Sequence, residues 1–437
     1  MKQLLLLFCI LYSLRMYGQN TAARVDTLSP DEAVRIALEN NYDIRLSQAD
    51  ADIARLNNTR ANAGMLPTVA LNAGENVSVN AFQYQKFFDG RSNENYGVLA
   101  NTVSASVLLN WTLYDGRRMQ ITKKRLEELE RLGTLNLQTT VQNTTSQVLQ
   151  AYYAIVQGRL QERALEELIT LNEERLRIAE ARLAAGFAAQ TDALQARIDL
   201  NQRRSDLLTQ KNATAAAKRS LNRLLVRPAD TAFEVSENIQ NSYTPERNAL
   251  IQKILSQNPT LLALQKNAEV AALIVEENRT LNKPRIVGVG QFSAQRADNG
   301  AGILLNNTQT GLAAGATLSI PLYTGGNIRR QVETAKLAAQ QASLLTDAQR
   351  LTFETDLDNQ LTFYQTQQQI FQLENDNVRI ARENLDVSTE RFRVGTTNGL
   401  EIQTAQNTLE QALVRRNLVL FNLKSAEIRL RLLAGEL

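Results

Sequence analysis

The side chains that enzymes most often use for catalysis are scarce in this sequence. Its 437 residues contain no His and a single Cys, Cys9, which lies in an apolar N-terminal stretch. Without His the chain cannot form a Ser-His-Asp triad, an imidazole zinc site or a His-based pH switch. We therefore expect neither an enzyme nor a resident metal or cofactor.

Two other patterns could support chemistry, and each has a simpler interpretation. Gly288 and Gly290 match the beginning of a dinucleotide-binding glycine motif, but Ser293 takes the position of the third glycine and no helix is expected to follow. A group of carboxylates comprises Glu127, Glu128 and Glu130. Charges at this density in a helical sequence indicate a solvated helix face.

The N-terminus has the layout of a secretory signal peptide. Lys2 precedes an apolar stretch over residues 4–14, and the small Gly18 follows. We expect residues 1–18 to be removed on export; a buried N-terminal helix is the alternative. Cleavage would leave a nearly neutral chain without thiols, which gives no reason to expect nucleic-acid binding. No later stretch contains 18 consecutive apolar residues, so any membrane crossing requires β-strands.

A duplicated pattern divides the rest of the chain. The sequence Leu-Tyr-x-Gly ends at Gly116 and again at Gly325, and a second shared segment ends at Gly186 and at Gly395 with the same displacement. Unrelated stretches would not keep this register over so long a span, which indicates an internal duplication. The predicted parts are a first repeat at 19–227, a linker at 228–245 and a second repeat at 246–437.

Each repeat contains long stretches that favour helices. Residues 327–394 include neither Gly nor Pro, and the equivalent stretch 117–185 has only Gly133 and Gly158 as interruptions. Such helices are far longer than average and need lateral partners along their length.

A heptad pattern indicates what those partners are. Apolar residues recur every seven positions near the C-terminus, with Arg416 as an exception, and this is typical of coiled-coil packing. Gly186 and Gly395 stand where a left-handed cap would end each long helix. The sequence thus predicts an antiparallel helical hairpin in each repeat, with tips near 186–192 and 395–401. The heptad positions are Ala405, Ala412, Val419 and Ala426, with Ile402, Leu409, Leu423 and Leu430, and with Leu337, Leu344 and Leu351 in the preceding helix.

Before each hairpin the apolar period changes from seven to two. This alternation predicts strands with one apolar and one small or polar face, long enough to cross a bilayer; a half-buried strand on a soluble core is the alternative. With partner strands that begin at Pro67 and Pro284, the strand pairs lie at about 67–114 and 284–323. The residues expected to face lipid are Val107, Leu109, Trp111, Ala316, Leu318 and Ile320.

Four strands are too few to close a barrel, and an open edge cannot lie in lipid. Membrane strands therefore require an oligomer, and both a dimer and a trimer satisfy this requirement. The expected fold class is mainly α with a small β part: a duplicated strand pair and long antiparallel coiled-coil hairpins.

These motifs resemble the outer membrane efflux protein family of TolC type. The resemblance rests on the opening residues 28–33 and 40–42, on the duplicated Leu-Tyr-x-Gly and on the stretch 186–197, and it covers essentially the whole mature chain. It implies a homotrimer in which twelve strands form one outer-membrane β-barrel, continued by a periplasmic α-helical barrel. It also implies that residues 228–245 and the C-terminal tail form an equatorial belt.

The resemblance further implies a function and partners. Such a protein is the exit duct of a tripartite efflux or type I secretion system in the outer membrane of a Gram-negative bacterium, and it conducts substrate passively. Its partners are a periplasmic adaptor protein and an inner-membrane transporter of RND or ABC type. The sequence leaves open whether drugs, metal ions or proteins are exported.

The family closes its tunnel at the hairpin tips, so the resemblance assigns a gate residue by residue. Thr191 and Asp192 take the positions of polar links on the first hairpin, and Glu401 takes that of a carboxylate at the constriction. Thr404 and Thr397 depart from the pattern, because they replace a second carboxylate and a linking arginine. We therefore expect one ring of Glu401 side chains, which favours cations or binds a divalent ion, and a weaker latch. The alternative for Glu401 is a solvated residue that interacts with the helix dipole.

Two other functions fit parts of the sequence. A secreted coiled-coil filament or structural protein also favours long helices and avoids Cys and His, but it has no use for matched amphipathic strands. An exported enzyme would need a pairing of nucleophile and base that the sequence does not present.

Overall fold

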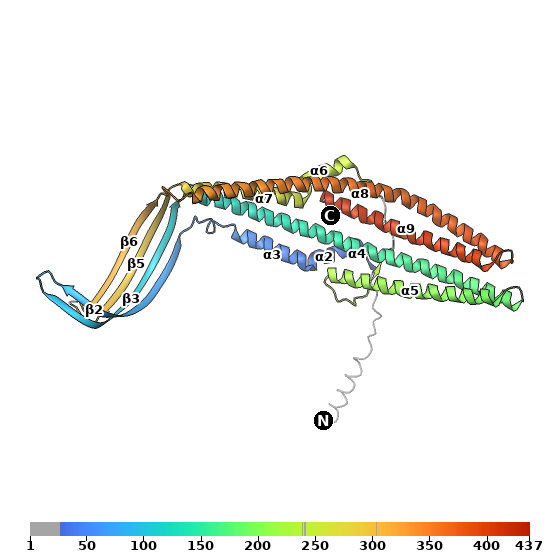
Figure 1. Ribbon diagram of the computed structural model, residues 1–437, viewed down its shortest axis with the longest axis horizontal. Coiled ribbons are helices and arrows are strands. Elements are labelled where there is room, and N and C mark those ends of the chain that lie inside the picture. The colour runs from blue at the N-terminus through green and yellow to red at the C-terminus, as the bar shows by residue number, and fades with distance from the viewer. Residues whose placement is uncertain (1–26, 238, 240–241, 303) are drawn as a thin grey trace, which may run out of the picture. The chain divides into compact units, whose positions relative to one another are not determined.

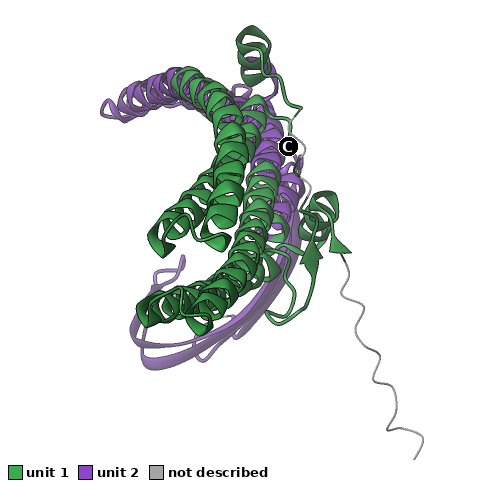
Figure 2. Ribbon diagram, turned by 90° about the vertical axis from the view of Figure 1, so that its right-hand side faces the viewer, with its two compact units in different colours: residues 1–45, 140–254, 354–437 green, residues 46–139, 255–353 purple. Residues whose placement is uncertain are grey.

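A computed structural model describes residues 27–437 except 238, 240–241 and 303. The predicted signal peptide lies outside the described residues. The described chain is mainly helical with one larger sheet, as the sequence predicts, and it divides into two compact units (Figure 2). Unit 1 comprises residues up to 45 with 140–254 and 354–437, and unit 2 comprises 46–139 and 255–353. Each unit therefore combines segments of both repeats.

The larger sheet belongs to unit 2 and has four antiparallel strands. They are β2 (Thr68–Lys86), β3 (Ser92–Tyr114), β5 (Arg285–Asn299) and β6 (Asn306–Ser319), in the order β2-β3-β5-β6 (Figure 1). Pro67 and Pro284 directly precede the first strand of each pair, where the missing N–H costs no ladder hydrogen bond. Among the described residues no strand pairs with the outer side of β2 or of β6.

One face of this sheet is apolar across all four strands. Residues paired across antiparallel strands point to the same face. Five of the residues predicted to face lipid therefore share one face of the sheet: Val107, Leu109, Trp111, Ala316 and Leu318. The opposite face carries small and polar residues such as Ser104, Ser106 and Thr317. The apolar rows that run across the sheet are Leu71, Val107, Phe292 and Leu312, then Val69, Leu109, Gly290 and Ala314, and then Trp111, Gly288 and Ala316.

Ile320 does not belong to that face. β6 ends at Ser319, so Ile320 lies outside the sheet, and its prediction as a strand residue is wrong. Pro321 follows directly. Because proline has no N–H and restricts the residue before it, the ladder cannot continue through this position.

Both strand pairs lead into the long helices through the same turn. Gly116 and Arg117 have φ angles of 71° and 76°, and the equivalent Gly325 and Gly326 have 61° and 76°. Glycine adopts this left-handed region without a steric penalty. The turn thereby explains why the Leu-Tyr-x-Gly motif is present in both repeats.

The long helices form two hairpins, α4 (Arg118–Ala184) with α5 (Gln190–Leu224) and α8 (Asn327–Arg393) with α9 (Gly399–Ala434) (Figure 1). α4 and α8 each have 67 residues. Gly133 and Gly158 interrupt the sequence pattern but not α4 itself. In the described part of the chain, no helix has an apolar stretch that meets the requirements of a membrane span.

The shorter elements begin with local caps. α2 (Pro30–Asn40) follows Ser29, whose hydroxyl accepts the Glu32 N–H at 3.1 Å. α7 (Pro259–Arg279) follows Asn258 in the same way, and in both helices Pro takes the first helical position, where no N–H is needed. The other helices are α3 (Tyr42–Asn57), α6 (Arg247–Gln257) and the short η1 (Thr280–Asn282).

The heptad residues of α9 form the core between the hairpins of unit 1. The residues predicted at its heptad positions, including Ile402, Leu409 and Ala412, are buried. Those from Ile402 to Ala412 pack in one cluster with Ala193 and Ala196 of α5 and with residues of α4 and α8. Alanines on both sides allow close helix approach, as the small heptad residues predict.

The predicted heptad row of α8 has a different outcome. Leu337, Leu344 and Leu351 are 63%, 58% and 66% exposed, so this chain does not bury them. The heptad spacing identified an apolar stripe correctly. It could not identify what covers that stripe, because the same spacing serves contacts within a chain and contacts between chains.

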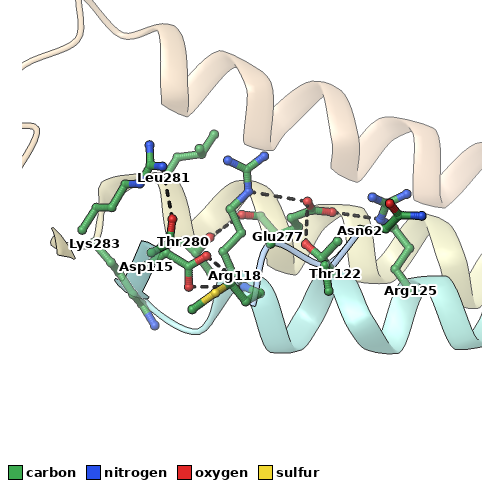
Figure 3. Close-up of a pocket in the computed structure, with 14 residues that line it drawn as sticks. Asn62, Asp115, Arg118, Thr122, Arg125, Glu277, Thr280, Leu281 and Lys283 are labelled. Atoms are coloured by element: carbon green, nitrogen blue, oxygen red, sulfur yellow. Dashed lines mark hydrogen bonds and ion pairs between the residues drawn. The ribbon is translucent and has the colours of Figure 1, made fainter. Parts of the chain in front are cut away.

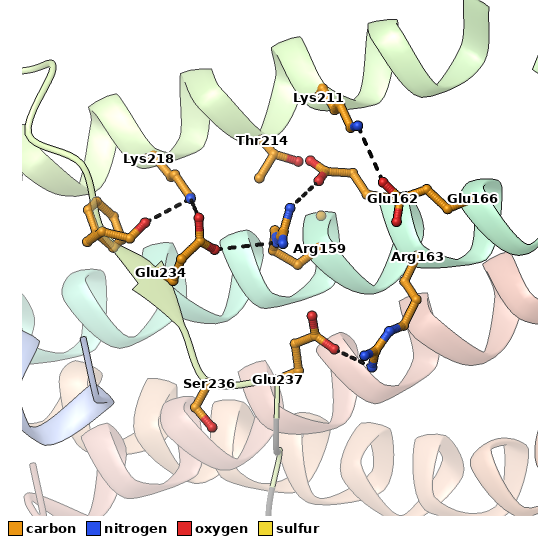
Figure 4. A network of polar contacts seen from close by, with 12 residues as sticks. Arg159, Glu162, Arg163, Glu166, Lys211, Thr214, Lys218, Glu234, Ser236 and Glu237 are labelled. Atoms are coloured by element: carbon orange, nitrogen blue, oxygen red, sulfur yellow. Dashed lines mark hydrogen bonds and ion pairs between the residues drawn. The ribbon is translucent and has the colours of Figure 1, made fainter. Parts of the chain in front are cut away.

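In unit 1 a small two-stranded sheet and the residues that follow it contact α4 and α5. β1 (Thr27–Leu28) pairs in parallel with β4 (Glu234–Val235), and the buried Tyr152 hydroxyl donates to the Leu28 carbonyl at 2.9 Å. Glu234 bonds with Lys218 at 3.0 Å and with Arg159 at 3.6 Å, while Arg163 bonds with Glu237 at 2.7 Å (Figure 4). These contacts attach the first part of the predicted linker to α4 and α5.

Candidate functional site

The two hairpin tips of unit 1 have the same backbone. Gly186 and Gly395 have φ angles of 77° and 81°, and the residue after each donates its N–H to a carbonyl five residues back, at 2.8 Å and 3.0 Å. This is the Schellman arrangement, which satisfies the last carbonyls of a helix. The glycines predicted to form the turns therefore lie just after the C-terminal ends of α4 and α8.

The first tip carries Thr191 and Asp192 in the first turn of α5. Both side chains are exposed. Within the described residues neither has a hydrogen-bond or ion-pair partner, so the chain alone does not form the polar link that the resemblance implies. Asp192 lies at a helix N-terminus, where a negative charge is favourable.

The second tip contains a polar cluster around Glu401. Its carboxylate forms an ion pair with Arg391 at 2.6 Å and accepts a hydrogen bond from the Thr397 hydroxyl. Asn398 caps α9 by accepting the N–H groups of Leu400 and Glu401, each at 3.2 Å. Thr397, which replaces a linking arginine, thus orients the carboxylate instead.

Thr404 is not part of that cluster. Its hydroxyl donates to the Leu400 carbonyl one turn back at 2.8 Å, which satisfies it within α9. The structure therefore brings Thr397 and Glu401 together and leaves Thr191, Asp192 and Thr404 apart. Among the described residues no group of three or more acidic or Cys side chains is arranged to hold a metal ion.

A buried ion pair of the first hairpin is hydrogen-bonded to the second hairpin farther from the tips. Arg175 on α4 is 3% exposed and forms an ion pair with Asp199 on α5 at 2.8 Å. Asp199 also accepts the Gln403 side-chain N–H at 3.0 Å, and Arg175 donates to the Gln406 side-chain carbonyl at 3.4 Å. A buried charge with its hydrogen bonds satisfied holds its neighbours in one arrangement.

A second link lies about one turn farther along α9. Arg203 on α5 forms an ion pair with Glu410 at 2.6 Å and donates to the Asn407 side-chain carbonyl at 2.8 Å. Burial raises the pKa of Glu410 above its ordinary value, although Arg203 acts in the opposite direction. The polar bond therefore lies in an environment that disfavours charge.

The sequence interpretation missed both links, although a signal existed. Gln403, Gln406, Asn407 and Glu410 follow each other at helical spacing beside the apolar heptad row. Such a stripe of polar residues next to a coiled-coil seam occupies the positions that set partner choice between helices.

A cross-hairpin contact also occurs at the tips themselves. Arg182 donates to the Phe392 carbonyl at 2.9 Å, and its guanidinium carbon lies 5.0 Å from the centre of the Phe392 ring. The last turn of α4 thereby satisfies a terminal carbonyl of α8.

Comparison with known proteins identifies the family to which this architecture belongs. A family model described as "Outer membrane efflux protein" matches residues 33–226 and 250–436. Outer membrane efflux protein BepC of Brucella suis is 25% identical over 379 residues, which are 83% of this chain and 78% of BepC. Outer membrane protein TolC of Escherichia coli is 24% identical over 447 residues, which are 95% of this chain and 85% of TolC.

Solved structures show the same fold. The outer-membrane channel OprN aligns with a TM-score of 0.78 at 16% identity, over 93% of this chain and 90% of OprN. CusC aligns with the same TM-score, over 96% of this chain and 95% of CusC. The resemblance identified from the sequence motifs is therefore confirmed: the chain belongs to the outer membrane efflux protein family and is an outer-membrane protein.

Proposed function

We propose that this protein is the exit duct of a tripartite efflux or type I secretion system. In this function it conducts substrate passively from an inner-membrane transporter across the periplasm and the outer membrane, without catalysis or a cofactor. The relatives' names include both an efflux protein and the alkaline protease secretion protein AprF of Pseudomonas aeruginosa. The family alone therefore does not choose between small molecules and proteins as substrate.

The observation that carries the proposal is the open, one-sided sheet. Its apolar face includes Leu312 and Leu318, which are 83% and 60% exposed, and within the described chain its edge strands β2 and β6 each have an unpaired side. Unpaired backbone groups cannot remain in lipid. The edges must therefore pair with other copies, and three copies supply the twelve strands of a closed barrel.

The exposed row of α8 supports the same assembly. Leu337, Leu344 and Leu351 form an apolar stripe that a helix of a neighbouring copy would bury. A trimer thereby places further helices beside α8 and continues the barrel as a helical passage.

In this assembly the polar residues of the tips divide into two groups. The links of Arg175 and Arg203 hold the two hairpins of one copy together. Thr191, Asp192 and Thr404 have exposed side chains that are available to neighbouring copies or to the passage. Glu401 is the carboxylate of the constriction, with its charge partly balanced by Arg391.

The tips also present apolar side chains for partners. Phe187, Val394 and Leu400 are 77%, 68% and 67% exposed. Clustered apolar side chains of this kind mark interaction sites. We assign them to contact with the periplasmic adaptor, beyond which an inner-membrane transporter of RND or ABC type supplies the substrate.

Disulfide trapping between edge strands tests the assembly. Apart from Cys9 the chain has no Cys, so Asn72→Cys on β2 can be combined in turn with Gln309→Cys, Ala313→Cys or Thr317→Cys on β6. Within one chain three strand spacings separate these edges, about 14 Å, and a disulfide needs Cα atoms within about 7 Å. Oxidation should therefore give a covalent trimer for at least one combination.

The pair Ser106→Cys with Ser293→Cys is the control, because these residues are register partners within one chain. It should form a disulfide within one chain, so the protein should still migrate as a monomer under denaturing conditions. A covalent dimer as the final product, or a ladder that continues beyond three copies, would rule out the trimeric duct.

A further inference from the structure

A cavity of about 460 Å³ lies in unit 2 where the sheet meets the helices. Its walls come from the segment 62–64 before β2, the β3–α4 turn, the first turns of α4, the C-terminal end of α7 with η1, and the start of β5 (Figure 3). These elements come from both sequence repeats.

The cavity has a surplus of positive charge. Four cationic side chains line it, those of Arg118, Arg125, Lys283 and Arg285, against two carboxylates. Its lining is more polar than apolar. The chemistry of the cavity is therefore set by these charged groups.

Both carboxylates are already committed to the protein itself. Asp115 accepts the Met119 N–H at 3.0 Å and thereby caps α4. Glu277, whose side chain is 12% exposed, accepts from Arg125 Nε at 2.9 Å and from the Thr122 hydroxyl at 3.0 Å. Arg118 Nε lies 3.5 Å from the same carboxylate.

The donors, by contrast, are only partly used. Arg118 and Arg125 both approach Glu277 through Nε, and Figure 3 shows the terminal nitrogens of Arg118 directed away from it. Among the described residues the Lys283 ammonium has no hydrogen-bond or ion-pair partner. The cavity thus offers N–H donors and positive charge to a group that only accepts.

Packing and ion pairs constrain the stem of Lys283 and the two arginines Arg118 and Arg125. A Cβ on Gly116 would lie 2.4 Å from Lys283 Cβ, so the turn backbone packs directly against the lysine stem. Glu277 fixes the two arginines from the other side. Preorganised donors lose less entropy on binding than flexible surface side chains do.

The position of the cavity indicates where such a group comes from. β3 ends at Tyr114 and β5 begins at Arg285, so the cavity lies directly at the helix-side end of the apolar face. In an outer-membrane protein this end of the strands reaches the headgroup layer, where lipid phosphates are concentrated.

We propose that this cavity binds a phosphate group, carried either by a phospholipid headgroup at the edge of the membrane or by a free phosphate. Guanidinium groups bind phosphate through paired N–H donors, and a lysine adds a point charge. A bound headgroup would connect the sheet end, α4 and α7 through one ligand.

The test compares two doubly substituted full-length proteins extracted in detergent. The first, Arg118→Met with Lys283→Met, removes one Arg and one Lys from the cavity and leaves the Arg125–Glu277 ion pair intact. The control, Lys124→Met with Arg329→Met, removes the same charges from exposed positions of unit 2 outside the cavity. The single variant Lys283→Met breaks no side-chain hydrogen bond or ion pair among the described residues and keeps an unbranched stem beside Gly116, so it controls for a folding effect.

Binding is measured with phosphatidylglycerol by native mass spectrometry and with inorganic phosphate by calorimetry at constant ionic strength. We expect the wild type and the control to bind alike, the cavity double variant to bind about tenfold or more weakly, and Lys283→Met to lie between them. Tight binding of phosphatidylglycerol but not of inorganic phosphate assigns the lipid headgroup, and comparable binding of both assigns the free ion. Equal binding by the cavity variant and the control, or no binding by the wild type, would overturn the proposal.

Discussion

The two hairpin tips have the same backbone and different side-chain chemistry. Arg182 and Arg391 are equivalent residues of the two repeats, yet Arg182 crosses to the Phe392 carbonyl while Arg391 pairs with Glu401 of its own hairpin. The equivalents Asp192 and Glu401 differ likewise, since only Glu401 has partners among the described residues. The duplication therefore preserved the Schellman turn and let the polar contacts diverge.

The turns at the sheet ends differ in a similar way. Gly116 packs against Lys283, whereas nothing lies within 4 Å of a Cβ built on the equivalent Gly325. The next position is Arg117 in the first repeat and Gly326 in the second, with the same φ of 76°. Side-chain space, rather than backbone conformation, distinguishes the two copies.

The largest expected difference between the copies concerns these turn glycines. Gly116→Ala adds both left-handed strain and a clash with the Lys283 stem, and we expect a loss of about 3 kcal/mol or more. Gly325→Ala adds only the strain, about 1–2 kcal/mol. Thermal unfolding followed by circular dichroism compares the two. Equal losses would show that Lys283 moves aside without cost.

The second largest effect concerns the link between hairpins, to which the first repeat contributes the arginine. Arg175→Ala removes the cation beside Asp199, whose side chain is 15% exposed, and we expect a cost of about 2 kcal/mol, below that of a fully buried pair because water reaches the carboxylate. The control is Arg382→Ala, which removes an ion pair with Glu167 at 2.7 Å whose side chains are 51% and 39% exposed. It should cost under about 1 kcal/mol.

The two variants are compared by hydrogen exchange of the α5 and α9 backbone amides near the tips. Faster exchange in Arg175→Ala than in Arg382→Ala is expected. The assignment of the buried link as the main polar contact between hairpins fails if both variants exchange alike.

The N-caps of α5 and α9 predict a smaller change in stability, of opposite sign at the two tips. Asn398 caps α9, and the equivalent Ala189 precedes α5 without a side-chain cap. Asn398→Ala should lower stability by about 1 kcal/mol, and Ala189→Asn should raise it by up to about the same amount. Local exchange at the two helix starts should move in opposite directions. If Ala189→Asn brings no protection, the first tip differs in more than its cap residue.

The smallest expected effect is a gain at the strand-to-helix turn. Arg117→Gly gives the first repeat the residue of the second and removes left-handed strain of about 1 kcal/mol. The melting temperature should rise slightly, with Arg118→Gly as a control that should destabilise the start of α4. An unchanged melting temperature would mean that Arg117 makes a compensating contact.

The sequence predicted the helices and strands of this protein well, whereas its prediction of a gate at the tips stays a prediction. Strand alternation and heptad spacing report directly on which face of an element is apolar, so the paired strands, the hairpins and the α9 core were found. The prediction that Ile320 belongs to a strand was wrong, because Pro321 ends the ladder of hydrogen bonds. Leu337, Leu344 and Leu351 are exposed in this chain because heptad spacing does not identify which helix covers an apolar row. The contacts of Arg175 with Gln406 and of Arg203 with Asn407 were missed because these partners come from the other repeat, more than 200 positions away.

The sequence by itself determined the periodic features, since glycines, prolines and apolar spacing act over a few residues along the chain. Those features were enough to identify the family. Only the tertiary structure decided which charged side chains meet: Arg175 with Asp199 and Gln406, and Arg118 with Glu277. Hydrogen bonds and ion pairs depend on distances of about 3 Å between groups far apart in the chain, and no local pattern specifies those distances.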